Sequence, residues 1–188
     1  MSLINVGEIR KGIIIELDGQ LYSVVDFQHI KMGRGSAQVR MKLRNVRTGS
    51  TVDRTFQAGE RFQRVRLDHR TVQFLYSDGE MYHFMDTETF DQIALTREQL
   101  GDAVNYLKDG ITLELLSYND EPIGVELPIT VDLKVVETEP GFRGDTATGG
   151  SKPARVETGL VVQVPLFVNQ GDTIRVDTRT GAYLERVG

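Results

Sequence analysis

Apolar and polar residues alternate along most of this chain, in short runs of the length that single β-strands have. The alternation is clearest after residue 37, where a strand would place apolar side chains on one face and cations on the other. The residues of these two faces are Val39, Met41 and Leu43, and Arg40, Lys42 and Arg44. The pattern therefore predicts a strand with one buried face and one basic face.

The same pattern, broken by turns such as Asp18-Gly19 and Thr48-Gly49, predicts strands along the whole chain. We expect them from residue 12 to the first turn and over 21–27, 38–43, 51–56, 65–67, 72–76, 81–85, 90–95, 111–118, 122–127, 129–136, 160–164, 173–176 and 183–187. One helix is expected, because Thr96 and Gln99 have the spacing of a capping box and apolar residues follow at helical spacing up to Leu107.

Short strands at this spacing are typical of small barrels. We therefore predict an all-β protein of three small β-barrel domains, over residues 1–64, 65–128 and 129–188, with the one short helix in the middle domain. A length of 188 residues is sufficient for three such cores of modest size.

The net charge of −5 is unevenly distributed. Residues 1–64 hold 11 Lys and Arg against 6 Asp and Glu (net +5), residues 65–128 hold 4 against 13 (net −9), and residues 129–188 hold 7 against 8 (net −1). Residues 27–52 contain six cations and no acidic residue. This distribution predicts that the first domain meets an anionic partner and that the middle domain avoids one.

Catalytic chemistry has little support in the sequence. None of His29, His69 and His83 has a partner at metal-ligand or triad spacing, and the chain has no Cys. An enzyme that uses Asp86 or Asp91 is the weakest alternative, because their turn positions fit a solvated face better. We predict no enzyme activity, no metal and no cofactor. The chain lacks a membrane-length apolar run and a signal-peptide pattern, so we expect a cytoplasmic protein without membrane contact.

Two glycine-rich segments are candidates for contact with a partner. In residues 31–37, Gly33 and Gly35 flank Arg34, so a tight hairpin tip would project this side chain into solvent; an ordinary solvated tip is the alternative. The second segment is a loop expected over residues 137–152. It lacks the Lys position and the following helix of a phosphate-binding loop, but its polar side chains could contact RNA. A purely structural connection is the alternative here.

These two segments, the domain sizes, the single helix and the run from Lys152-Pro153-Ala154 to Val164-Pro165 together resemble bacterial translation elongation factor P, along essentially the whole chain. The resemblance implies a KOW/SH3-like first barrel, two OB-fold-like barrels and an L-shaped, tRNA-like outline. It also implies a monomeric factor that binds both subunits of the ribosome, between the peptidyl-tRNA and exit sites, and stimulates peptide-bond formation on stalled sequences, notably consecutive prolines.

The resemblance assigns roles to residues as well. Arg34 would reach the acceptor end of the peptidyl-site tRNA. Supporting RNA contacts are expected from Lys31, Gly33, Gly35, Arg40, Lys42 and Arg44, and a small-subunit contact from the loop containing Arg143, Gly144, Asp145, Thr146 and Lys152.

Arg34 is also the position at which many family members carry a modification. Lysine modification is chemically excluded at an arginine, which leaves a bare side chain, our preference, or a rhamnosylated one made by a modifying enzyme. The alternative function is a general RNA-binding or RNA-chaperone module. Such proteins interleave aromatic and basic residues, whereas residues 31–47 contain no Phe, Tyr or Trp.

Overall fold

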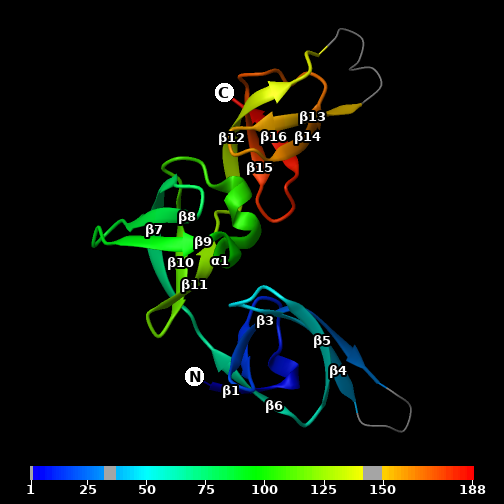
Figure 1. The fold of residues 1–188 in the computed structure, drawn as a ribbon. Helices are drawn as coiled ribbons and strands as arrows, with labels where there is room; N and C mark the ends of the chain where they lie inside the picture. The colour runs from blue at the N-terminus through cyan, green and yellow to red at the C-terminus, as the bar shows by residue number, and fades with distance from the viewer. Residues whose placement is uncertain (1, 32–36, 142–149) are drawn as a thin grey trace. The chain divides into compact units, whose positions relative to one another are not determined.

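The structure is a computed structural model that describes residues 2–31, 37–141 and 150–188. In these ranges the chain is built mainly from strands, which form three sheets (Figure 1). The backbone divides into two compact units, Met1–Arg70 with Leu115–Gly124, and Thr71–Glu114 with Val125–Gly188. No helix among the described residues is long and apolar enough to cross a membrane.

The N-terminal sheet has the strand order β1-β6-β2-β3-β4-β5. Its strands are β1 (Ser2–Asn5), β2 (Ile14–Leu17), β3 (Gln20–Ile30), β4 (Gln38–Asn45), β5 (Thr51–Gln57) and β6 (Arg61–Val65), with a 3₁₀ turn, η1 (Val6–Glu8), after β1. β1 was not predicted from the sequence. It is four residues long and is held by antiparallel pairing with β6, which is 56 or more residues away along the chain.

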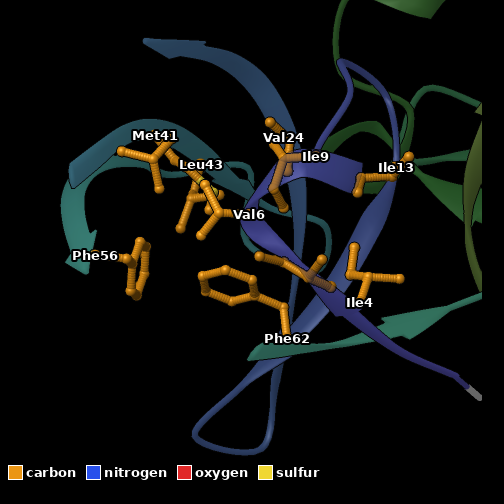
Figure 2. Packing of buried hydrophobic residues seen from close by; sticks show 11 residues of the cluster. Ile4, Val6, Ile9, Ile13, Val24, Met41, Leu43, Phe56 and Phe62 are labelled. Carbon is orange, nitrogen blue, oxygen red and sulfur yellow. The ribbon is translucent and has the colours of Figure 1, made fainter. Parts of the chain in front are cut away.

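The inward-facing side chains of this sheet form one hydrophobic core, shown in Figure 2. Phe56 and Phe62 meet edge to face in it, with ring centroids 4.9 Å apart. Its buried members are Ile4, Val6, Ile9, Ile13, Ile15, Val24, Val39, Met41, Leu43, Phe56 and Phe62. Three of these residues come from β4, so the core fixes which face of that strand points outward.

The middle sheet has the order β11-β10-β7-β8-β9. Its strands are β7 (Asp68–Ser77), β8 (Met81–Asp86), β9 (Gln92–Thr96), β10 (Thr112–Tyr118) and β11 (Glu121–Glu126). The predicted strand over residues 65–67 is wrong: β6 ends at Val65 and β7 begins at Asp68, so these residues are the connection between two sheets.

The predicted helix begins where expected but changes type after one turn. Thr96 caps α1 (Arg97–Leu100): its hydroxyl accepts a bond from the Gln99 amide (3.2 Å), and its own amide donates to the Gln99 side chain (2.9 Å). The capping box is therefore confirmed. At Gly101 the backbone takes φ +57° and ψ −134°, and the chain continues as a 3₁₀ helix, η2 (Gly101–Tyr106).

The C-terminal sheet has the order β14-β13-β12-β15-β16. Its strands are β12 (Thr130–Thr138), β13 (Ser151–Val156), β14 (Val161–Pro165), β15 (Thr173–Asp177) and β16 (Tyr183–Val187). The loop predicted over residues 137–152 is shorter than expected, because β12 continues to Thr138 and β13 begins at Ser151. The side-chain alternation of both strands persists into these end residues.

The hairpin between β7 and β8 is held by one carboxylate. Asp78 accepts hydrogen bonds from the amides of Glu80 (3.0 Å) and Met81 (2.8 Å), and it lies 2.9 Å from His83 Nε2. The bond from His83, followed by those from the two amides, holds the pKa of Asp78 well below its usual range. The ring of His83 stacks on that of Tyr76 with centroids 4.5 Å apart, so this histidine supports the hairpin.

This carboxylate predicts a dependence of stability on pH. The unfolded chain protonates Asp78 near its ordinary pKa of about 3.9, whereas the folded chain resists protonation, so its contribution is complete above about pH 4 and is lost as the pH falls. Asp78→Asn should therefore reduce the difference between urea midpoints measured at about pH 6 and about pH 3.

Asp109→Asn, which removes an exposed carboxylate from the same region, is the matched control and should leave that difference nearly unchanged. An unaltered pH dependence in Asp78→Asn would contradict the assignment.

Candidate nucleic-acid interface

β4 presents a basic face, as its alternating sequence predicts. Val39, Met41 and Leu43 have no exposed surface and point into the core. The residues that alternate with them, Arg40, Lys42 and Arg44, are exposed. This part of the sequence interpretation is confirmed at the level of the strand: the three cations lie along one side of β4.

The strands on either side of β4 give these three cations different electrostatic surroundings. Directly opposite residues in a sheet bring their Cβ atoms within about 5.5 Å. Arg40 lies opposite Gln28 in β3 and Thr55 in β5, both of which are uncharged. Arg44 lies opposite Ser23 and Thr51, likewise uncharged.

Lys42 lies between two carboxylates, Asp26 in β3 and Asp53 in β5. Asp26 is also approached by the ammonium of Lys11, at 3.5 Å. The positive charge of Lys42 is therefore partly compensated within the sheet, whereas Arg40 and Arg44 face neutral neighbours in β3 and β5. The sequence alone could not reveal this difference, because it depends on the register of three strands.

Phe27, an aromatic residue of β3, does not lie on the basic face. Phe27 lies opposite Met41, a core residue, and packs against the hydrophobic core. Its ring meets that of His29 edge to face at 5.6 Å. The arrangement on β3 and β4 therefore lacks the interleaved aromatic platform that a general single-strand binder would use.

The proposed tip of this hairpin falls partly outside the described residues. Lys31 is described and is exposed at the end of β3. Gly33, Arg34 and Gly35 lie outside the described residues, so their expected contacts stay predictions. The last paired residues before the tip are Ile30 and Gln38, which places Arg40 two positions into β4 from that end.

The second candidate segment is described only at its ends. Arg143, Gly144, Asp145 and Thr146 lie outside the described residues, so their roles stay predictions. Lys152 is described and is only 5% exposed. Its ammonium donates a hydrogen bond to the backbone carbonyl of Glu139. This burial argues against the direct RNA contact expected for Lys152. The sequence signal for the burial was the alternation of residues 152, 154 and 156 with polar neighbours.

The carboxylates of the middle sheet serve local structure. Asp86 is 4% exposed and accepts bonds from the amides of Glu88 (2.7 Å) and Thr89 (2.9 Å). Asp91 accepts a bond from the Thr89 hydroxyl at 3.0 Å. Across residues 2–31, 37–141 and 150–188, no three His, Cys, Asp or Glu side chains gather in a way that could hold a metal ion.

A cavity of about 750 Å³ lies in the C-terminal barrel, lined mainly by apolar and small residues from β14, β16 and the turns beside them. Its described lining contains no carboxylate, histidine, lysine or arginine; it is formed by Gly150, Ser151, Val161, Gln163, Val164, Pro165, Leu166, Phe167, Thr180, Gly181, Ala182 and Tyr183. It is therefore chemically unlike the basic face.

Family models for elongation factor P match this chain in three consecutive segments. The KOW-like domain model matches residues 5–62, the OB domain model residues 67–125, and the model "Elongation factor P, C-terminal" residues 131–186. The all-β prediction with a KOW-like barrel followed by OB-type barrels is confirmed. The domain boundaries at residues 64 and 128 stay a proposal, since the backbone divides differently into compact units.

Full-length relatives carry the same name. Elongation factor P of Moorella thermoacetica is 57% identical over 184 residues, covering 98% of this chain and 100% of that protein. Elongation factor P of a Thermoanaerobacter species is 56% identical over 185 residues, with the same coverage. Among solved structures, the "Eukaryotic translation initiation factor 5A from Methanococcus jannaschii" has a TM-score of 0.51 at 22% identity, covering 68% of this chain and 92% of that one, which supports the fold.

The unequal surroundings of the cations predict unequal contributions to anion binding. Arg40→Gln should lower the salt concentration at which the protein elutes from heparin, and reduce the salt slope of binding by about one counterion. Lys42→Gln should have a smaller effect, because Asp26 and Asp53 already compensate that charge. Equal shifts in the two variants would contradict the register argument.

Proposed function

Because the chain belongs to the elongation factor P family, we propose that it is a translation factor that binds the ribosome between the peptidyl-tRNA and exit sites. There it stimulates peptide-bond formation on stalled sequences, notably consecutive prolines. Its partners in this role are both ribosomal subunits and the peptidyl-site tRNA. The observation that carries the proposal is the whole-length family match, joined to the exposed cations on β4.

The chemistry of the basic face suits a phosphate backbone. Arg40 and Arg44 each offer a planar guanidinium with several donors, which matches the oxygens of phosphate groups better than a point charge does. Their neutral neighbours in β3 and β5 leave that charge available to a partner. The strand itself is fixed by its buried face, so these side chains need little ordering of the backbone when RNA binds.

Peptide-bond formation with proline depends strongly on the position of the acceptor end of the tRNA. The proline ring restricts the backbone and makes the attacking amine and the peptidyl end difficult to align. A factor that holds the acceptor end can lower the barrier by orientation alone, without a proton-transfer residue. In this proposal Arg34 contacts the acceptor end from the tip between β3 and β4, and the β4 cations anchor the hairpin behind it.

The side chain of Arg34 has two possible states, bare and rhamnosylated, which a mass measurement separates. A bare Arg34 suffices for the electrostatic contact, whereas a rhamnosylated one would require a modifying enzyme as a further partner. Intact mass of natively expressed protein distinguishes the two, because a bare chain has the mass of its sequence.

The proposal predicts the effect of removing the tip cation. In a reconstituted translation system, the intact protein should accelerate Pro-Pro bond formation. Arg34→Ala should lose at least about tenfold of that acceleration, equivalent to about 1.4 kcal/mol of transition-state stabilisation, while still binding ribosomes. The measurement is the single-turnover rate at saturating factor, together with ribosome co-sedimentation.

Arg54→Ala is the matched control. Arg54 lies in the same barrel but is paired with Asp18 at 3.5 Å and stacked over Phe56 at 5.2 Å, so its loss should leave the rate unchanged. If natively expressed, intact protein does not change the rate, the proposed function is wrong.

A further inference from the structure

Lys152 occupies a core-facing position in β13. The strand alternates strictly, with Ser151, Pro153 and Arg155 exposed and the residues between them buried. Lys152 lies opposite Val164 of β14, whose side chain has no exposed surface. A lysine that is 5% exposed at such a position is unusual, because an ammonium is almost never buried unless it is paired.

The partner of this ammonium is a backbone carbonyl next to the preceding strand, β12. Lys152 Nζ donates to the carbonyl of Glu139, the residue immediately after β12. A second hydrogen bond, from the Thr138 hydroxyl to the Pro153 carbonyl (2.9 Å), joins the end of β12 to the start of β13. Residues 138 and 154 are also the last pair in the register of β12 with β13. The buried lysine therefore joins the residue after β12 to the start of β13.

Gly141 lies against the backbone that follows β14. A Cβ atom at this position would overlap the carbonyl oxygen of Leu166 and lie 3.3 Å from its carbon. Both atoms belong to the backbone just after β14, so no side-chain movement could relieve the overlap. The close approach of two backbones here requires a residue without a side chain.

We propose that Lys152 and Gly141 are positioning residues, which hold the described residues on either side of segment 142–149 at fixed points on the C-terminal barrel. The inference rests on the proposed function in one respect, since that function assigns the segment a contact with the small ribosomal subunit. A methionine would fill the space of the lysine stem without a buried charge. The specific contribution of the ammonium is therefore its hydrogen bond to Glu139, which joins the end of β12 to the start of β13.

Lys152→Met separates this role from a direct contact and from a general loss of stability. It preserves the apolar stem in the core, so the melting temperature should change by no more than about 4 °C. The amides of Glu139, Gly141 and Gly150 should exchange with solvent at least about tenfold faster, while those of β15 should be unaffected. Affinity for isolated small subunits should fall about threefold to tenfold.

Lys134→Met is the matched control. Lys134 is an exposed lysine of β12 in the same barrel. This variant therefore removes the same charge without changing the contacts between the end of β12 and the start of β13. It should change neither exchange rates nor affinity. Gly141→Ala is the second variant and should accelerate exchange at the same amides. If Lys152→Met fails to fold, the exchange rates of Gly141→Ala alone test the proposal.

The outcomes distinguish the two proposals. Unchanged exchange in both Lys152→Met and Gly141→Ala overturns the positioning role. A loss of affinity in Lys152→Met with unchanged exchange also overturns it, because it indicates direct contact by the lysine. Faster exchange with unchanged small-subunit affinity supports the positioning role and contradicts the proposed ribosomal contact of the segment.

Discussion

The two-residue period of β4 is the constraint on which the proposed RNA interface depends. The core of the N-terminal barrel requires Val39, Met41 and Leu43 to point inward, and the same backbone must then direct Arg40 and Arg44 outward. A shift of one residue in the register would bury cations and expose the core. Packing energy that stabilises the barrel therefore also fixes the basic face, and no separate device is needed to orient it.

Charge elsewhere in the molecule is used differently. Arg175 bonds Asp132 at 2.9 Å, Arg179 bonds Asp177 at 2.9 Å, and each guanidinium lowers the pKa of its carboxylate. Asp78 holds a hairpin in the middle sheet. These carboxylates serve the chain's own turns and strands. In the proposed function, binding and local structure therefore use separate sets of charged residues, and the guanidinium groups of Arg40 and Arg44 belong to the first set.

The sequence predicted what is set by neighbouring residues and missed what is set by distant ones. The alternation in β4 and the capping box at Thr96 are local, and both were found. β1 exists only because β6 pairs with it, and the compensation of Lys42 appears only when β3, β4 and β5 are in register. Lys152 was expected in a contact loop because of its residue type, whereas its position continues a buried alternation and its ammonium donates to a backbone carbonyl.

Locating the basic hairpin on the ribosome tests the proposed RNA interface most directly. The chain has no cysteine, so Gln28→Cys, opposite Arg40, can carry a single tethered iron chelate that cleaves nearby RNA. The proposed function predicts cleavage in the acceptor arm of the peptidyl-site tRNA from this position and none there from Glu98→Cys, an exposed site in the middle part of the chain. Cleavage of the acceptor arm from Glu98→Cys alone, or from neither position in complexes that retain the bound factor, would contradict it.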